Sequence, residues 1–246
     1  NYENIKSSKA TSGALDLGGA STQLAFDTKN IPASDLTPKT KDDKKVVKLK
    51  LNNKKYKIFS ISFLGLGQDQ ARENILKTTP DSFYYCYPKG TPIPVSSDYN
   101  IISQGNFRPM NCRWAAKRVL DQKDVYSKIN KFLTPELTSK HNDKKFMAFA
   151  GFYYTSDFFD KSKNLKELSN SIKEKCKDNW NDFKTNNPGT PSKFLVNECI
   201  SGSYALELLH GGYKFPINNS NKINFVKDVD WTKGAALYYF LYPLKK

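Results

Sequence analysis

The chain has 246 residues, of which 38% are hydrophobic and 13% aromatic, so it can bury a core and is not globally disordered. Its formal net charge of +15 comes largely from lysine-rich patches at residues 39–57, 140–145 and 161–177. Because these patches contain little Arg and few interleaved aromatic residues, they disfavour a dedicated nucleic-acid reader. The positive field would still concentrate polyphosphate anions or attract an acidic partner.

Two hairpins are predicted in the first quarter of the chain. Apolar residues flank a Gly-Gly pair within residues 13–27, which predicts a strand, a tight turn and a second strand. Residues 46–51 and 56–61 alternate apolar and polar side chains around Asn52-Asn53 and predict the second hairpin.

The rest of the chain predicts helices over one sheet. Helices are predicted at residues 69–77, 112–132, 152–159, 165–180, 199–209 and 231–241. Within residues 112–132, apolar residues recur at helical spacing. Strands are expected at residues 146–150 and 223–226, and prolines between residues 79 and 111 predict irregular structure. The apolar run 235–244 predicts a short buried helix. Hairpins followed by helices that cover one sheet indicate an α/β fold.

The turn of the first hairpin has residue types that suit a polyphosphate site. Glycine lets the backbone approach a bulky anion, so we expect the N–H groups of Gly18, Gly19 and Ala20 to bind phosphate. The Asp16 carboxylate, at the mouth of the turn, can hold a divalent cation through a coordinated water. The alternative is an ordinary Gly-Gly turn in which Asp16 bonds to its own loop.

Ser21 and Gln23 lie two residues apart on the outgoing strand, so their side chains point to one face. Hydrolysis of a nucleoside polyphosphate needs a positioned water, donors for the phosphate oxygens and a cation. We therefore expect Ser21 and Gln23 to orient the attacking water. In the alternative, they only satisfy the hairpin backbone.

The sequence from Asp16 to Gln23, Asp-Leu-Gly-Gly-Ala-Ser-Thr-Gln, resembles the fourth conserved region of the apyrases, the ecto-nucleoside triphosphate diphosphohydrolase family. Other segments resemble further motifs of that family, in family order, at residues 62–72, 86–90, 146–155 and 231–236. The resemblance runs from residue 13 to residue 238, which is nearly the whole chain.

The resemblance implies a fold of two ribonuclease-H-like lobes of the actin/sugar-kinase superfamily, with the nucleotide between them. Residues 1–215 resemble the second lobe, and residues 216–246 would return to pack on the first lobe. The family's first phosphate loop and its catalytic-glutamate segment have no counterpart here. The N-terminal half of the same protein is therefore the expected partner and source of the catalytic base, and this chain alone should be feeble or inert.

The activity implied by the resemblance is removal of terminal phosphates from nucleoside tri- and diphosphates with Mg²⁺ or Ca²⁺. Tyr154 is the expected stacking platform for the nucleobase, and Gly151 leaves room at the ribose. Asp69 would touch the ribose or base edge, or else serve only as the acid at a helix N-terminus. Trp231 is expected to support the phosphate loops rather than touch substrate.

The opposite wall of the base slot departs from the family pattern. Lys193, Phe194 and Glu198 stand where family members have Arg or Tyr, which leaves the base preference open. The competing functional hypotheses are a catalytically silent subunit that binds nucleotides or polyanions, and another actin-superfamily member such as an exopolyphosphatase or sugar kinase.

The four cysteines contain no Cys-x-x-Cys pair, so zinc binding is disfavoured and free thiols stay possible on the residues alone. The family resemblance implies two disulfides, Cys86–Cys112 and Cys176–Cys199, and hence the extracellular space or the secretory lumen. The sequon at Asn218 agrees with that compartment. No stretch is long and apolar enough to span a bilayer.

Several remaining residues are expected to have structural or surface roles only. Phe146, Phe149 and Phe152 should pack in the core. Arg113 and Arg118 lie on a predicted helix and should be solvated. The two histidines are isolated in the sequence, so surface or cap positions are expected for His141 and His210.

Overall fold

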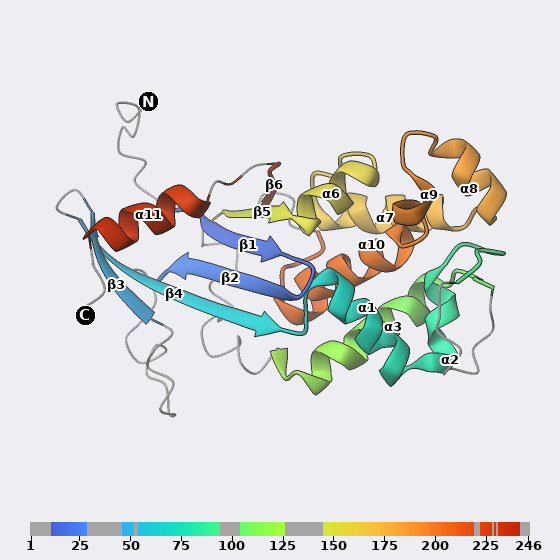
Figure 1. Ribbon diagram of the computed structural model, residues 1–246, viewed down its shortest axis with the longest axis horizontal. Helices are drawn as coiled ribbons and strands as arrows, with labels where there is room; N and C mark the ends of the chain where they lie inside the picture. Colours follow the sequence, from blue (N-terminus) through green and yellow to red (C-terminus); the bar gives the residue numbers. More distant parts are fainter. Residues whose placement is uncertain are drawn as a thin grey trace.

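The computed structural model describes residues 11–28, 46–51, 54–93, 104–125, 145–218, 222–227, 229 and 231–241. These residues contain a six-stranded sheet in the order β3-β4-β2-β1-β5-β6 (Figure 1). Its strands are β1 (Gly13–Leu17), β2 (Ser21–Asp27), β3 (Val46–Leu51), β4 (Lys54–Leu64), β5 (Phe146–Ala150) and β6 (Ile223–Phe225). The mixed α/β class and both predicted hairpins are confirmed.

Strand pairing fixes which side chains share a face of the sheet. β1 with β2 and β3 with β4 form antiparallel hairpins, and β2 also pairs antiparallel with β4, whereas β5 is parallel to β1 and β6 is parallel to β5. Leu15, Leu17 and Leu24 are buried, while Asp16 and Gln23 between them are half-buried. One face of the sheet therefore forms the core, and the other presents the polar residues of the first hairpin.

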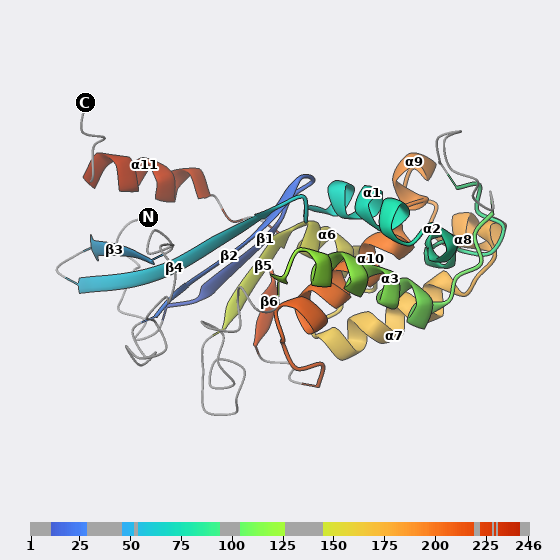
Figure 2. The same cartoon turned by 90° about the horizontal axis from the view of Figure 1, so that it is seen from below.

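The helices gather toward the end of the sheet where β1 and β4 finish (Figures 1 and 2). The longer ones are α1 (Gln68–Thr78), α3 (Pro109–Gln122), α6 (Gly151–Phe158), α7 (Leu165–Cys176) and α10 (Glu198–Glu207). Shorter turns are α2 (Pro80–Phe83), η3 (Tyr84–Cys86), α8 (Trp180–Asn186), α9 (Ser192–Leu195) and the π-turn η4 (Leu208–Gly212). β3 and the start of β4 extend away from this helical layer.

α10 is the centre of the helical layer. Its residues 199–207 are all buried, and it contacts α1, α3, α6 and α7. Two disulfides lock its surroundings, because Cys176–Cys199 joins α7 to α10 and Cys86–Cys112 joins η3 to α3. Both pairings implied by the family resemblance are thus confirmed, and the chain has no free cysteine.

The helix boundaries differ from prediction where capping residues intervene. The helix expected over residues 165–180 stops at Cys176, because Asn179 accepts bonds from the N–H groups of Asn181 and Asp182 (both 3.1 Å) and begins α8. In the stretch predicted to be irregular, prolines open α2 and α3, where their missing N–H costs nothing. Residues 126–132 of the predicted helix 112–132 lie outside the described residues.

Arg113 is not solvated as expected. Its Nε and Nη2 donate to Glu207 Oε2 at 2.9 and 2.7 Å, and Glu207 is only 6% exposed. Packing of α3 on α10 buries this carboxylate, which needs a charged partner once it leaves water. Arg118 is exposed as predicted. His210 Nδ1 lies 2.9 Å from Phe215 O in a turn, and His141 lies outside the described residues.

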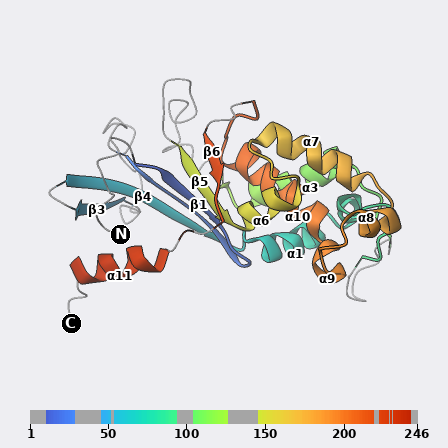
Figure 3. The same cartoon turned by 90° about the horizontal axis from the view of Figure 1, so that it is seen from above.

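The prediction of a buried helix at the end of the chain was wrong. α11 (Trp231–Leu241) lies apart from the helical layer in both turned views (Figures 2 and 3). Tyr239 and Phe240 are 54% and 82% exposed, because no described element packs over that side of the helix. The Trp231 side chain lies outside the described part of the chain. No described helix is long and apolar enough to cross a membrane.

Candidate active site

Hydrogen bonds to its carbonyl groups hold the β1–β2 turn against the junction of β4 and α1. The oxygens of Gly18, Gly19 and Ala20 accept bonds from backbone N–H groups at the β4–α1 junction. The donors are Gln68 N (2.8 Å) to Gly18, Asp69 N (3.0 Å) and Gln70 N (3.2 Å) to Gly19, and Gly65 N (2.8 Å) to Ala20. A trans peptide directs its N–H opposite to its C=O, so the N–H groups of Gly19 and Ala20 point away from α1.

Two of the three predicted phosphate donors are available for a ligand. The Gly18 N–H closes the turn by donating to Ser21 O at 3.0 Å. Within the described residues, the N–H groups of Gly19 and Ala20 have no acceptor. The first N–H groups of α1 are occupied by the turn, so that helix terminus positions the anion site rather than forming it.

Close backbone approaches bring three segments together at the turn. A Cβ at Gly67 would lie 2.3 Å from Ser21 N and 2.4 Å from Gly19 C, so only glycine fits there. A Cβ at Gly151, the first residue of α6, would lie 2.7 Å from Leu17 O and from Gln68 Oε1. Gly67 was not predicted as a site residue, although the Gly-x-Gly pattern before the helix was the available signal.

The junction of β5 and α6 is strained next to this contact. Ala150 has φ 55° and ψ −125°, a backbone conformation that residues with a Cβ rarely adopt. Such strain persists only where surrounding contacts enforce it, and it is common at functional sites.

A row of polar side chains crosses three strands on the open face. Asp16 pairs with Gln23 across β1 and β2, and Gln23 pairs with Ser62 across β2 and β4. Gln23 Nε2 donates to Ser21 Oγ (2.7 Å) and to Ser62 Oγ (3.0 Å). The predicted common face of Ser21 and Gln23 is confirmed by this contact, while their action on water stays a prediction. Ser62 was missed because its place opposite Gln23 depends on strand register.

The Asp16 carboxylate can supply one ligand to a cation whose other ligands are water and phosphate oxygens. The carboxylate is half-buried on the open face, and burial raises the pKa of Asp16. The described residues contain no group of three or more His, Cys, Asp or Glu side chains that could enclose a metal ion. A single partly desolvated carboxylate therefore fits a Mg²⁺-type ion completed by water and ligand phosphates.

Two buried tyrosines support the site from the core side. Thr22 Oγ1 donates to Asp16 O (2.6 Å), and Tyr213 OH lies 3.0 Å from Thr22 Oγ1. Because the Thr22 hydrogen is used by Asp16 O, the Tyr213 hydroxyl is the donor in the second bond. Tyr204 OH donates to Leu66 O (2.7 Å) just before α1. Sequence periodicity predicts only that such tyrosines are in the core, so it could not predict their hydrogen bonds to Thr22 and Leu66.

Asp69 and Gly151, two of the residues predicted to bind the nucleoside, lie beside the same turn. A Cβ at Gly19 would be 2.9 Å from Asp69 Oδ2, and Asp69 also pairs with Arg72 (3.4 Å). Tyr154, on α6, is 62% exposed. Phe146, Phe149 and Phe152 are buried and have the core role expected of them.

The residues of the predicted opposite wall lie on α9 and at the start of α10. Phe194 is 57% exposed, and Lys193 Nζ lies 4.8 Å from its ring centroid. Burial alone raises the pKa of Glu198 to about 7.

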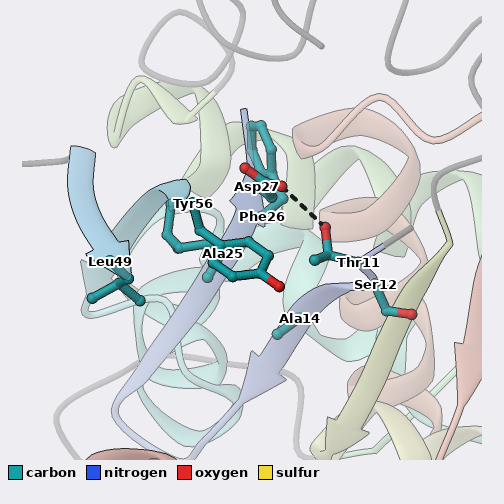
Figure 4. Close-up of a pocket in the computed structure, with 9 residues that line it drawn as sticks. Thr11, Ser12, Ala14, Ala25, Phe26, Asp27, Leu49 and Tyr56 are labelled. Atoms are coloured by element: carbon teal, nitrogen blue, oxygen red, sulfur yellow. Dashed lines mark hydrogen bonds between the residues drawn. The ribbon is translucent and has the colours of Figure 1, made fainter. Parts of the chain in front are cut away.

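A separate pocket of about 320 Å³ lies farther along the sheet. Figure 4 shows Tyr56 lying across Ala14 and Ala25, with Thr11 bonded to Asp27 (Oγ1 to Oδ2, 3.5 Å). None of the predicted site residues lines this pocket.

The sequence comparison identifies the family to which this arrangement belongs. The model of the GDA1/CD39 (nucleoside phosphatase) family matches residues 1–243. The chain belongs to this family. The GDA1/CD39 assignment agrees with the resemblance inferred from the Asp16–Gln23 motif.

Curated relatives in several animals are named as numbered ectonucleoside triphosphate diphosphohydrolases. The chain is 27% identical to ectonucleoside triphosphate diphosphohydrolase 2 of Mus musculus over 96% of its length, and 28% identical to ectonucleoside triphosphate diphosphohydrolase 1 of Bos taurus over 95%. It covers 51% of each of these relatives, so it spans about half their length. Among solved structures, an exopolyphosphatase-like protein aligns over 99% of this chain and 63% of its own, with 12% identity and a TM-score of 0.45.

Proposed function

We propose that this chain supplies the phosphate- and cation-binding part of an apyrase, which removes terminal phosphates from nucleoside tri- and diphosphates. The observation that carries the proposal is that the N–H groups of Gly19 and Ala20, next to Asp16 and Gln23, have no hydrogen-bond acceptor within the described residues. Membership of a nucleoside phosphatase family supports the same reaction class.

Each polar group at the turn has a distinct task in this proposal. The N–H groups of Gly19 and Ala20 stabilise charge on the phosphate oxygens. Asp16 would hold Mg²⁺ or Ca²⁺ through a water, and the bound ion would neutralise polyphosphate charge. Gln23 donates through Nε2 to two serine hydroxyls, which leaves its Oε1 to accept a hydrogen from the attacking water.

The general base is proposed to come from the N-terminal half of the same protein. In this proposal residues 1–215 form the second ribonuclease-H-like lobe, and residues 216–246 return to the first. The exposed aromatic side chains of α11 support this arrangement, because a large apolar surface is usually covered by a partner. The family motif that resembles the Asp16 turn supports placing the nucleotide between the lobes.

The nucleobase is proposed to stack on Tyr154, with Asp69 and Gly151 beside the ribose. Phe194 is the candidate for the opposite wall, since it is exposed and aromatic. Tyr154→Ala should raise the KM for ATP by about tenfold, as expected for loss of one stacking contact. Trp114→Ala, which removes an exposed aromatic side chain from α3, is the matched control and should leave KM unchanged.

Release of phosphate from ATP and ADP by native protein that contains both halves tests the proposal. Release should stop when a chelator removes divalent cations, and Asp16→Asn should lower kcat by about 10³-fold. Asp157→Asn, an exposed carboxylate on α6, should have no effect. If native protein releases no phosphate but its melting temperature rises with ATP, the silent nucleotide-binding alternative is correct. The departures at Lys193, Phe194 and Glu198 favour that alternative.

We further propose that the protein acts outside the cytosol. Two disulfides with no free cysteine support an oxidising compartment, and Asn218 of the glycosylation sequon is exposed. The relatives' names include the prefix "ecto", which agrees with this location.

A further inference from the structure

Two cross-strand pairs of lysines face each other on the β3–β4 ribbon. Lys48 lies opposite Lys57, and Lys50 lies opposite Lys55. All four side chains are exposed, and residues 46–57 contain no Asp or Glu. We call this set the lysine ladder.

The lysine ladder occupies a single face of the ribbon. Side chains alternate along a strand, so all four lysines share one face and Val47, Leu49, Tyr56 and Ile58 share the other. Leu49, Tyr56 and Ile58 line the pocket in Figure 4, so the apolar face is turned toward the rest of the hairpin sheet. Phe59 on the same face is buried, so the exposed side chains at positions 48, 50, 55 and 57 are all lysines.

This arrangement works against the stability of the ribbon. Like charges directly opposite each other on paired strands repel. Lysines do protect sheet edges from pairing with other chains, and β3 is an edge strand. Edge protection would be served equally by alternating Lys and Glu, which attract each other. Edge protection therefore does not explain why all four residues carry a positive charge.

We propose that the lysine ladder binds a linear sulfated polysaccharide. Four ammonium groups in a two-by-two array match a chain with closely spaced anions, and binding would relieve their repulsion. Lys acts as a point charge and does not impose the bidentate geometry that Arg gives to phosphate recognition. The two disulfides indicate an oxidising compartment, where sulfated polysaccharides occur and nucleic acids are scarce.

A membrane surface fits the ribbon less well. Membrane-binding elements place basic residues around the apolar residues that insert into the bilayer. In the β3–β4 ribbon, the lysine ladder lies on the opposite face from Leu49, Tyr56 and Ile58, so a bilayer could not contact both.

The ladder is separate from the candidate active site. Its lysines share the face of Phe59, whereas Ser62 and Gln23 lie on the opposite face of the sheet. Along β4, Lys57 and Ser62 are five residues apart, which corresponds to about 17 Å. The proposal therefore does not depend on the proposed hydrolase activity.

The test measures binding of a size-defined heparin fragment to the native protein by surface plasmon resonance in 0.15 M salt (roughly physiological). A ladder variant combines Lys48→Gln, Lys50→Gln, Lys55→Gln and Lys57→Gln. A control variant combines Lys161→Gln, Lys163→Gln, Lys166→Gln and Lys173→Gln, which are also exposed and remove the same charge. Circular dichroism checks that both variants are folded.

The ladder variant should lose affinity by several hundred-fold, about fivefold for each lysine. Its affinity should also depend less steeply on salt, because fewer counterions are released. The control variant should stay within about threefold of the native protein, since surface charges elsewhere act through a screened field. The double variant Lys48→Gln/Lys57→Gln should fall between the native protein and the ladder variant.

Three results would overturn the proposal. Equal losses in the two four-lysine variants would mean that net charge alone causes binding. Unchanged affinity of a folded ladder variant would exclude the ladder. Tighter, ladder-dependent binding to phosphatidylserine vesicles or to DNA than to heparin would assign the ladder to a membrane or to nucleic acid instead.

Discussion

The two ends of β4 differ in how they are built. At residues 58–64 the strand pairs with β2, buries Phe59 and Ile61, and places Ser62 within a hydrogen-bonded polar row. At residues 54–57 it pairs with β3 and exposes Lys55 and Lys57 on one face. The first end has directional hydrogen-bonding groups placed by strand pairing, whereas the second has point charges on exposed side chains. We infer that the first end suits chemistry on a defined group and the second suits low-specificity adhesion.

Among substitutions on β2 and β4, the largest effect is expected from Gln23→Ala at the first end. The substitution removes the amide that bonds to Ser21 and Ser62, so kcat for ATP should fall on the order of 100-fold. Ser62→Ala removes only one anchor of that amide and should cost less than about tenfold. Steady-state kinetics measure both, and heparin affinity should not change in either. A Gln23→Ala enzyme with native kcat would remove Gln23 from the mechanism.

A smaller loss is expected from Gly67→Ala. The added Cβ would meet Ser21 N at 2.3 Å and must displace the phosphate turn, so kcat should fall by roughly tenfold to 100-fold. Gly189→Ala is the control, because a Cβ there meets nothing within 4 Å. If the two variants have equal kcat, the close approach of α1 to the turn is not needed for activity.

The pH dependence of stability should be visible at Glu198, at the start of α10. Burial raises the pKa of this carboxyl from 4.5 to about 7, so the folded protein binds the proton more tightly than the unfolded chain does. Stability is therefore highest below about 4.5 for this group and falls as the pH rises through about 7. Urea unfolding at pH 5 and pH 8 (roughly either side of that pKa) measures the free energy of unfolding. This free energy should fall less between the two pH values in Glu198→Gln than in the native protein. Identical declines in the two proteins would contradict this assignment.

The smallest effect is expected in the ribbon itself. Lys48→Gln/Lys57→Gln removes one repelling pair, so the free energy of unfolding should rise by up to about 1 kcal/mol while heparin affinity falls. Thermal unfolding measures the gain, and Lys163→Gln/Lys166→Gln is the control. A lower melting temperature in the ribbon variant would mean that the lysines stabilise the fold.

The sequence predicted the strands of the first hairpin because apolar and polar residues alternate around Gly18-Gly19. It also predicted that Ser21 and Gln23 share a face, since this depends only on strand periodicity. The disulfide pairing came from the family resemblance, not from the spacing of the cysteines.

Features that depend on tertiary contacts could not be predicted. The Gly18 N–H is used inside the turn, and the Tyr213–Thr22 contact joins residues 191 positions apart. Arg113 meets Glu207 only because α3 packs on α10. The lysine ladder required the register of β3 on β4, which the lysine-rich composition of residues 39–57 does not specify.

The most direct test of the active-site assignment is electron paramagnetic resonance of Mn²⁺ with the native protein and a non-hydrolysable ATP analogue. Mn²⁺ should bind together with the analogue, and Asp16→Asn should weaken that binding by about 10-fold to 100-fold, as for other residues that act through a metal-bound water. Asp157→Asn should bind Mn²⁺ as the native protein does. Equal Mn²⁺ affinity in native and Asp16→Asn protein would contradict the assignment of the cation to the β1–β2 turn.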